Sequence, residues 1–582
     1  MPNERTLPTR APTDRPTFTL LVEGEAVSRE LHVVSVVVIK MVNRVSSAKI
    51  VLLDGDPSSE NFVVSGTDQF VPGKGVEIKA GYHSREESIF KGVIVSHGVK
   101  TRQGKPSFLV LECRHEAFKT TLNPRSAYYS ETKDSEVFEE ILSDHAITAD
   151  VESTEVTHKE LVQYDCKDWD FLISRAEANG LLVFTNAEGV AVKKPDFSSE
   201  PVISLLYGAT MLEFEAQADA REQIPGVTCK SWDLTNQQMA SSEGEAPEMA
   251  EQGNFVSEDL ASAAGRGDLV LQHTGWLPDE ELKSWADGRL LKARMAKVRG
   301  RVKFPGFAGV NPGALIELRG VGDRFNGRAF VTGVRHEVGS GTWTTDAQFG
   351  FPDDFFMARP DVQSRPAGGL LPAVNGLQLG IVTGLQDDPD GEHRIRVRMP
   401  VVDPQSEGVW ARVSSLDAGE DRGAFFRPEI GDEVVLGFLN DDPRDPVVLG
   451  MLNSSAKPAP LEAEDENHEK GFVTRSGMRL LFNDDKVSVG VETPEGQTIT
   501  LSDEEGTIVL KDQHGNSITM DSEGITIESA AKLQIKAAQD LNLEGTNTGF
   551  KASSQFKAEG SSGAEFTSGG TVVVRGSVVQ IN

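Results

Sequence analysis

Cysteine and positive charge are scarce in this sequence of 582 residues. The three cysteines, Cys113, Cys166 and Cys229, are an odd and widely spaced set, which excludes a disulfide framework and a four-thiolate zinc site. We therefore interpret them as buried apolar thiols. Lys and Arg number 58 against 89 Asp and Glu, and the formal net charge of -31 argues against a protein that neutralises phosphates. We expect no nucleic-acid partner.

Long apolar runs are also missing. The most apolar segment, Val33–Val42, is about half the length that a membrane-spanning helix requires, and it contains Lys40. The first 18 residues are charged and rich in proline, where a signal peptide would need an apolar core. We expect residues 1–16 to form a flexible arm, and we expect the chain to fold in the cytoplasm of its producer.

Catalytic and metal-binding motifs are absent from the sequence. It contains no G-x-S-x-G, no H-E-x-x-H and no G-x-x-x-x-G-K-[ST]. The segment Asp387–His393 is similar to a calcium loop, but Gln386 takes the first ligand position and Val397 the twelfth, so a hairpin turn is the better interpretation. The sequence therefore predicts no catalytic residue, no cofactor and no metal site, and hence a protein that is not an enzyme.

Short strands and turns dominate what is present, because the sequence holds 56 Gly and 28 Pro and only 38% hydrophobic residues. From residue 470 to 582, apolar pairs at positions i and i+2 recur every seven to ten residues. The main pairs are Ile499/Leu501, Ile508/Leu510, Ile518/Met520, Ile525/Ile527, Leu533/Ile535 and Leu541/Leu543. Each unit has too little apolar surface to fold alone, so we expect several chains to share one axis. The alternative is a single-chain parallel β-solenoid.

The rest of the chain divides into three parts. Residues 371–453 alternate like the strands of an OB-fold, and residues 454–469 are an acidic, proline-containing linker. Residues 17–370 mix strands with helices expected at 134–145, 168–180 and 279–297. Within this part Val71–His97 and Asn311–His336 share a Pro-Gly, an apolar–Glu–apolar strand, an acidic loop, an aromatic residue and a strand that ends in His. This similarity predicts a duplicated small barrel.

Several of these segments resemble a known family. Trp410–Val413, Ala418–Gly419 and Phe426–Asn453 are similar to the spike barrel of VgrG-type proteins, the central spikes of contractile injection systems, and Asp168–Phe184 is similar to their hub. The resemblance implies a homotrimer that is mainly β, with an α+β hub of two similar barrels (17–370), an OB-fold (371–453) and a triple-stranded intertwined β-helix needle (470–582). The apolar pairs would then form the needle core, with Val579 and Ile581 at its tip.

The resemblance also implies a function. The trimer would join a sixfold tube to a threefold needle and pierce the target envelope when the sheath contracts. Its partners would be tube and baseplate proteins, a PAAR-type protein at the tip, effector cargo and, transiently, the target membrane. It would be made in the bacterial cytoplasm, assembled into a particle and released on firing. Ser47–Asp56 and Ile89–Arg102 look closer to extracellular phage-like systems than to type VI secretion spikes.

Two other functions stay open at this point. One is a wall- or polysaccharide-degrading β-solenoid enzyme. The other is a receptor-binding fibre, which would call for a globular head at its C-terminal end.

Overall fold

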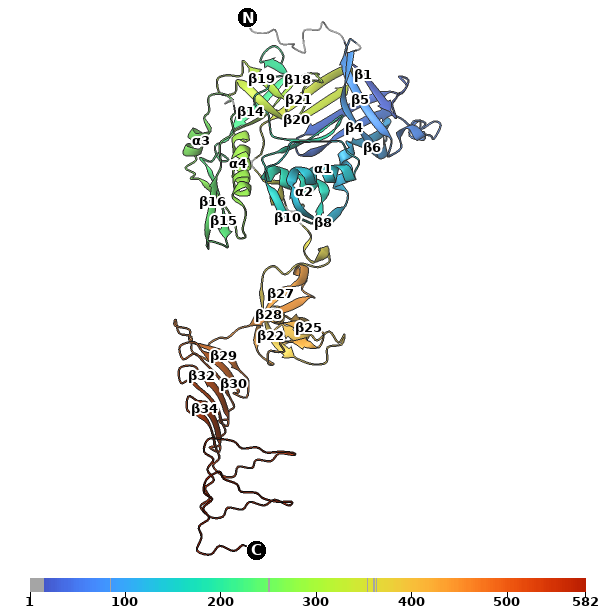
Figure 1. The fold of residues 1–582 in the computed structure, drawn as a ribbon. Helices are drawn as coiled ribbons and strands as arrows, with labels where there is room; N and C mark the ends of the chain where they lie inside the picture. Colours follow the sequence, from blue (N-terminus) through green and yellow to red (C-terminus); the bar gives the residue numbers. More distant parts are fainter. Residues whose placement is uncertain are drawn as a thin grey trace. The chain divides into compact units, whose positions relative to one another are not determined.

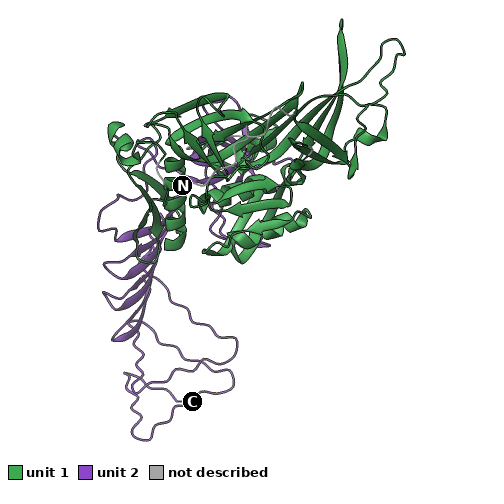
Figure 2. Cartoon of the chain, turned by 90° about the horizontal axis from the view of Figure 1, so that it is seen from above, with its two compact units in different colours: residues 1–376, 438–445 green, residues 377–437, 446–582 purple. Residues whose placement is uncertain are grey.

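The computed structural model describes residues 15–581 apart from 84, 250, 251, 353, 360, 361 and 363, so most of the expected N-terminal arm lies outside the described residues. The chain divides into two compact units, which Figure 2 colours separately. The first comprises residues 1–376 and 438–445, and the second comprises residues 377–437 and 446–582.

Two copies of one β-subdomain form the body of the first unit. Together they make a 13-stranded sheet (Figure 1) with two main apolar cores, the first of which also includes Val338 and Trp343 of the second copy. The first copy consists of β1 (Thr17–Val22), β3 (Val33–Met41), β4 (Arg44–Leu53), β5 (Gly75–Tyr82), β6 (Arg85–Arg102) and β7 (Lys105–Arg114), with the short β2 (Glu25–Ala26). The second consists of β13 (Ile203–Leu206), β14 (Glu213–Ala218), β18 (Val298–Pro305), β19 (Leu315–Arg319), β20 (Gly327–Gly339) and β21 (Thr342–Phe349).

The duplication predicted from the sequence is confirmed by the strand pairing. In the first copy the order is β1-β5-β6-β7-β4-β3, and in the second it is β13-β19-β20-β21-β18-β14. Gly73 and Gly313 both take a positive φ, at +98° and +94°, which glycine adopts without steric cost. Each then donates its N–H to the long strand of its own copy, to the carbonyls of Ile94 and Val331, at 2.8 Å.

The two copies match residue for residue along these hairpins, but the matching histidines do not coincide. Val95 in β6 and Thr332 in β20 are the corresponding bulged residues, because the pairing with β7 and β21 skips them. Counting from these bulges, Val99 and not His97 occupies the position of His336. The shared terminal histidine noted in the sequence is therefore a coincidence of spacing.

A single seam joins the copies. Strand β3 of the first copy pairs antiparallel with residues 333–339 of β20 in the second copy, with Val38 opposite His336. Both of these residues are fully buried. The seam therefore continues the apolar interior from one copy to the next.

Helices and smaller sheets complete the first unit. The helices expected from the sequence are confirmed as α1 (Asp134–Asp144), α2 (Asp168–Ala178) and α4 (Asp279–Met295), and α3 (Ser257–Ala263) was not expected. Helices α2 and α4 pack closely because a side chain at Gly288 would lie 2.8 Å from the carbonyl of Glu177. The small sheets contain β8 (Pro124–Lys133) with β10 (Thr157–Lys167); β9 (Ala149–Val151), β11 (Leu182–Asn186) and β12 (Gly189–Lys193); and β15 (Val227–Asp233), β16 (Gln238–Glu243) and β17 (Leu269–His273).

The second unit begins with the five-stranded closed barrel expected for an OB-fold. Its strands are β22 (Gln378–Gly384), β23 (Ile395–Arg398), β24 (Val409–Val413), β27 (Glu433–Phe438) and β28 (Pro446–Met451), with β25 (Ala418–Gly419) and β26 (Arg422–Gly423) paired beside it. Ile395, Val397 and Val434 are fully buried inside it. The barrel thus has an apolar interior of its own.

Seven short antiparallel strands follow the barrel and form a meander, in which each strand pairs with its neighbour in sequence. They are β29 (Glu469–Val473), β30 (Arg479–Asn483), β31 (Ser488–Glu492), β32 (Thr498–Ser502), β33 (Thr507–Lys511), β34 (Ser517–Asp521) and β35 (Gly524–Glu528). Within the described residues 529–581 there is no further strand. We call β29–β35 the needle sheet.

Candidate functional site: the apolar face of the needle sheet

The needle sheet lines up its apolar side chains in two continuous columns on one face. The strand register places Ile499 opposite Leu510, and Leu501 opposite Ile508, and the same pattern repeats along the sheet. The first column is Phe472, Leu480, Val491, Ile499, Leu510, Ile518 and Ile527. The second column is Phe482, Val489, Leu501, Ile508, Met520 and Ile525.

In the needle sheet the apolar side chains are exposed and a polar side chain on the other face is buried, the reverse of the arrangement expected for a sheet in water. Leu501 is 46% exposed and Ile525 68% exposed, whereas Ser502 on the opposite face is buried. Antiparallel sheets normally turn their apolar face to the core and their polar face to water. The apolar face of the needle sheet is therefore an uncovered interface.

Repeated turns hold the strands in register. The five-residue loops 474–478, 493–497 and 512–516 each close with a hydrogen bond from the N–H of the first residue to the carbonyl of the fifth, at 2.9 to 3.0 Å. The fourth residue of each loop is glycine, Gly477, Gly496 or Gly515, with φ between +82° and +90°. These glycines lie 19 residues apart. The structural repeat is thus a pair of strands, twice the single-strand unit read from the sequence.

The sequence-predicted core residues fall into two groups. The eight from Ile499 to Ile527 lie together in the two columns, whereas Leu533, Ile535, Leu541 and Leu543 lie outside any strand and are 55% to 63% exposed. The tip residues Val579 and Ile581 are 51% and 90% exposed. Residues 529–581 share the apolar alternation of the needle sheet, but the described part of this segment forms no strand within the chain.

The core prediction from the sequence omitted the first part of both columns. Leu480 with Phe482, and Val489 with Val491, follow the same i, i+2 spacing and join the columns through direct cross-strand pairs. Phe472 extends the first column by one strand. The signal was present, but the less regular glycine spacing in this stretch hides it.

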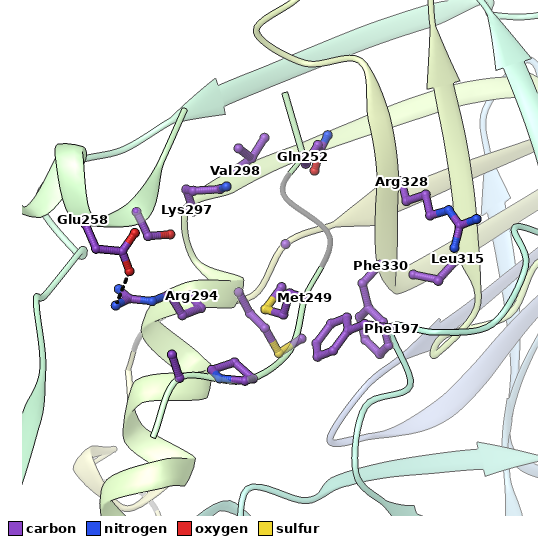
Figure 3. A pocket seen from close by; sticks show the side chains of 15 residues that line it. Phe197, Met249, Gln252, Glu258, Arg294, Lys297, Val298, Leu315, Arg328 and Phe330 are labelled. Atoms are coloured by element: carbon purple, nitrogen blue, oxygen red, sulfur yellow. Dashed lines mark hydrogen bonds and ion pairs between the residues drawn. The ribbon is translucent and has the colours of Figure 1, made fainter. Parts of the chain in front are cut away.

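The first unit contains a pocket of about 240 Å³ (Figure 3). Phe197 and Phe330 lie against each other on one side, and Arg294 and Lys297 lie on the other. Both cations are engaged, because Arg294 pairs with Glu258 at 3.2 Å and Lys297 donates to the carbonyl of Phe255 at 2.9 Å. Burial lowers the pKa of Lys297 to about 8. Since these cations hold neighbouring segments together, the pocket is structural in character.

A buried charged cluster around Asp134 also has a structural role. Arg175 binds Asp134 through two hydrogen bonds of 2.7 and 2.9 Å, and His158 and Asn179 each add one of 2.9 Å. Burial alone would raise the pKa of Asp134, but the hydrogen bonds from His158 and Arg175 outweigh it and hold this pKa well below its usual range. Asp134 stays ionised and ties α1 to α2 and β10, so it is unsuited to proton transfer.

The seam between the two copies contains two buried bases. Lys40 donates to the Asn311 side chain at 2.9 Å, and burial lowers its pKa to about 8. His336 contacts the Thr345 hydroxyl at 3.0 Å through Nδ1. Burial, assisted by the charge of Lys40, lowers the pKa of His336 to about 3. The native seam therefore holds a neutral imidazole.

The remaining sequence candidates have local roles. Two of the four carboxylates of the loop that is similar to a calcium site, Asp388 and Asp390, bind Arg394 inside the hairpin. Cys113 and Cys229 are buried, and burial raises the pKa of each thiol to about 12. Cys166 is only half-buried, so the expectation of three buried thiols was wrong for this residue.

The described residues contain neither a metal-binding cluster nor a membrane-spanning helix. No group of three or more His, Cys, Asp and Glu side chains there is arranged to hold a metal ion. None of the helices found there has both the length and the apolar character to span a bilayer.

The closed barrel and most of the needle sheet lie in segments that match domains of phage baseplates and type VI secretion systems. Residues 378–452 match the type VI secretion system/phage-baseplate injector OB domain, and residues 488–582 match the phage baseplate V C-terminal trimerisation domain. The chain belongs to the family of the Alg8 N-terminal domain, which residues 12–340, more than half of its length, match. The matches of residues 378–452 and 488–582 confirm the resemblance to VgrG-type spikes.

Curated relatives point to the same class. The chain is 28% identical over 212 residues to the type VI secretion system spike protein VgrG1b of Pseudomonas aeruginosa, covering 33% of this chain and 28% of that protein. It is 26% identical over 227 residues to VgrG1a of the same organism, covering 36% of this chain and 35% of that protein. The chain thus spans about a third of the length of these relatives.

Solved structures with a similar fold include a tail protein from Neisseria meningitidis, at 14% identity and a TM-score of 0.43, covering 60% of this chain and 99% of that one. Another is the E. coli c3393 protein, a component of the type VI secretion system, at 14% identity and a TM-score of 0.37, covering 75% of this chain and all of that one. Both TM-scores lie below 0.5, so these likenesses add nothing to the assignment.

Proposed function

We propose that the chain is the homotrimeric spike at the tip of a contractile injection system, and that it pierces a target envelope when the sheath contracts. The observation that carries this proposal is the uncovered apolar face of the needle sheet. Its alternation is regular over seven strands, yet residues such as Ile525 and Ile527 are 68% and 52% exposed in the single chain. A face of this size requires a cover.

Two further copies of the same sheet are the simplest cover. Three sheets arranged as the sides of a prism turn their columns inward, so that each level of the prism is filled by three equivalent side chains. Full burial of one such side chain contributes about 1.5 to 3 kcal/mol. Because the thirteen side chains of the two columns are already about half covered in the single chain, their further burial contributes on the order of 10 kcal/mol per chain or more. The match of residues 488–582 to a trimerisation domain supports this arrangement.

Beyond Glu528 the three chains would wind around one another. Residues 529–581 keep the apolar pairs but make no strand within the chain, as expected where each strand pairs with a neighbouring protomer. Intertwined strands leave no free edges, which gives a shaft its resistance to local unravelling. At the end of this shaft Val579 and Ile581 would present an apolar surface to a PAAR-type tip protein.

The first unit supplies the hub that docks on the tube. Since each chain carries two similar copies, a trimer presents six similar units, which suits a threefold spike on a sixfold tube. Tube and baseplate proteins are the direct partners under this proposal, and effector cargo is carried by the assembled particle. Three chains at -31 each give -93, which favours solubility and discourages adhesion to anionic envelopes before firing.

Under this proposal the chain does no chemistry, and the work of penetration comes from the sheath. It is made in the bacterial cytoplasm, joins a phage-like particle there and leaves the cell on firing. Contact with the target membrane is transient and passive. The enzyme alternative has no supporting observation in the described residues, because the buried cluster around Asp134 and the cations of the pocket in Figure 3 are engaged in structural contacts.

Mass and leakage measurements test the proposal. Light scattering of the purified chain should give a trimeric mass, and addition of the trimer to liposomes should release little dye. Turnover of a panel of wall and capsule glycans should stay at background. A monomer at micromolar concentration would contradict the spike, and strong leakage or glycan turnover would favour a pore-former or an enzyme.

A further inference from the structure

The first unit also contains a larger cavity, of about 550 Å³, beside the seam between its two copies. Three segments contribute to its lining: the end of β3, the β11–β12 hairpin and the Pro-Gly segment before β19. Lys40 comes from the first of these segments, Asn186 from the second and Asn311 from the third. The cavity therefore brings together residues from both copies and from one of the smaller sheets.

Lys40 is a buried cation that the chain leaves without a counter-charge. It is only 8% exposed, and its ammonium group donates to the side-chain oxygen of Asn311, a neutral acceptor, at 2.9 Å. Among the described residues no carboxylate forms an ion pair with it. Burying an unpaired charge is unfavourable, and buried charges in proteins are normally paired. The charge of Lys40 is thus available to a ligand in the cavity.

The groups around Lys40 are basic rather than acidic. Burial lowers the pKa of His115 and of His336, and the charge of Lys40 lowers both further. Burial also lowers the pKa of Lys40 itself to about 8, and no neighbouring carboxylate raises it again. At pH 7 the two imidazoles are therefore mostly neutral and Lys40 is mostly charged. An anion that enters the cavity meets a positive potential.

We propose that this cavity binds a small oxyanion, of the sulfate, phosphate or carboxylate type, at Lys40. Lysine binds such groups as a point charge, and neutral amide groups can donate further hydrogen bonds. Asn311 uses its side-chain oxygen for Lys40, which leaves its NH2 group as a donor. Asn186 uses its side-chain oxygen for the N–H groups of Glu188 and Gly189, at 2.9 and 3.0 Å, which leaves a second NH2 group.

The acidic residues that line the cavity do not neutralise Lys40. Asp150 binds Lys193 at 2.5 Å, and Asp196 accepts hydrogen bonds within its own turn. Glu188 and Lys194 are both exposed, and neither forms an ion pair in the part of the chain that the structure describes. Their charges cancel in the sum, so the charge of Lys40 remains in excess.

The two copies differ at the residue that holds Lys40. Asn311 begins the Pro-Gly segment of the second copy, and Val71 takes the corresponding position in the first copy. Valine offers no side-chain acceptor, so the site occurs once per chain. A bound oxyanion would link β3 of the first copy to this segment of the second. Because all of these residues lie in one chain, the inference does not depend on the spike proposal.

Titration calorimetry of the full chain tests the site, with sulfate as the probe because its charge is constant between pH 7 and pH 9. At an ionic strength held constant with chloride, we expect saturable binding of one sulfate per chain. Lys40→Met keeps an apolar stem and removes the charge, so the affinity should fall about ten- to hundredfold. Lys49→Met is the matched control, because Lys49 is an exposed lysine of the neighbouring strand β4, and its affinity should be unchanged.

The pH dependence of binding identifies the lysine without any substitution. Since the pKa of Lys40 is about 8, the fraction of charged Lys40 falls about tenfold between pH 7 and pH 9, and the affinity for sulfate should fall by the same factor. His115 and His336 stay neutral over this range, because their pKa values lie below 6.5. The other charged residues that line the cavity or act on His115 are Lys91, Glu116, Asp150, Glu188, Lys193, Lys194 and Asp196.

Acetate in a parallel titration distinguishes the two kinds of oxyanion. Tighter binding of sulfate would assign the site to a tetrahedral oxyanion, and tighter binding of acetate would assign it to a carboxylate. The inference is overturned if neither anion binds saturably, if Lys40→Met binds as tightly as the unsubstituted chain, or if the affinity is the same at pH 7 and pH 9. Each of these results would leave the spike proposal, which is tested by mass and leakage, unaffected.

Discussion

The hub and the needle sheet are built from similar strands, yet they treat their apolar side chains in opposite ways. In the hub Ile50, Leu52 and Leu109 are 0% exposed within one chain. In the needle sheet Ile525 and Ile527 are 68% and 52% exposed. The hub therefore has a core of its own, whereas the needle sheet has only one side of a core. Stability of the first is a property of each chain, and stability of the second depends on how many chains meet.

Removing the needle should destabilise the trimer more than any other change described below. A chain that ends after Lys457 loses both apolar columns and the segment that follows them, so we expect it to lose resistance to SDS and to dissociate to monomers on dilution. Circular dichroism should still report a folded β protein, because the hub core is complete without the needle. SDS gels of unheated samples and light scattering across a dilution series measure the effect. A truncated chain as resistant as the full one would contradict the comparison.

A single charged side chain on the apolar face should reduce trimer formation nearly as much as removing the needle does. Ile527→Asp places three carboxylates at one level of the proposed prism, and burying like charges together costs several kcal/mol per trimer. The trimer yield should fall sharply in light scattering. Thr526→Asp is the matched control, because Thr526 is the next residue on the same strand and points to the opposite face. Similar losses in both variants would mean that the face is not the interface.

Shortening a buried side chain of the hub should lower the unfolding free energy of each chain, whether or not the chains assemble. Leu52→Ala removes a side chain that is 0% exposed, and a cavity of this kind costs about 2 to 5 kcal/mol of unfolding free energy. Leu53→Ala, on the other face of the same strand, removes a side chain that is 43% exposed and should cost under about 1 kcal/mol. Urea unfolding followed by tryptophan fluorescence distinguishes the two, and the loss for Leu52→Ala should not vary with protein concentration.

The buried imidazole of the seam should make the stability of the hub depend on pH between about 3 and 6.5. His336 has a pKa of about 3 in the fold and 6.5 when unfolded, so below pH 6.5 the unfolded chain takes up a proton that the native chain does not. This part of the stability is complete above pH 6.5 and declines as the pH falls toward 3, by up to about 1.4 kcal/mol per pH unit. Urea unfolding at pH 7 and pH 5 should show a smaller pH slope in His336→Gln. Equal slopes would exclude this residue as the source.

Patterns within a segment were readable from the sequence. The i, i+2 pairs predicted short strands with one apolar face, and Ile499 to Ile527 do lie on one face. The helices at α1, α2 and α4 followed from their apolar spacing, and α3 was missed because seven residues are too few to show a period. The duplication followed from a shared Pro-Gly and the Glu-containing strand after it.

Which strands pair with one another could not be predicted from the sequence in this way. The meander of the needle sheet depends on which strand each turn brings alongside, and the apolar pairs are the same for a meander and for interwound chains. The bulges at Val95 and Thr332 shift the register by one residue, which no spacing of residue types reveals. For the same reason the seam between β3 and β20, and the bases buried in it, emerged only from the folded chain.

The meander also sets the order in which the parts of the needle would form. Every contact in the needle sheet is between strands that are adjacent in sequence, so this region has very short loops to close and can form quickly once synthesised. Residues 529–581 form no strand within the chain, and under the proposed arrangement their strand partners would be in other chains. Assembly would therefore begin where three preformed sheets meet and proceed in one direction, with the tip the last part to become ordered. The alignment of the three chains along their axis would thus be fixed before the interwound segments begin to form.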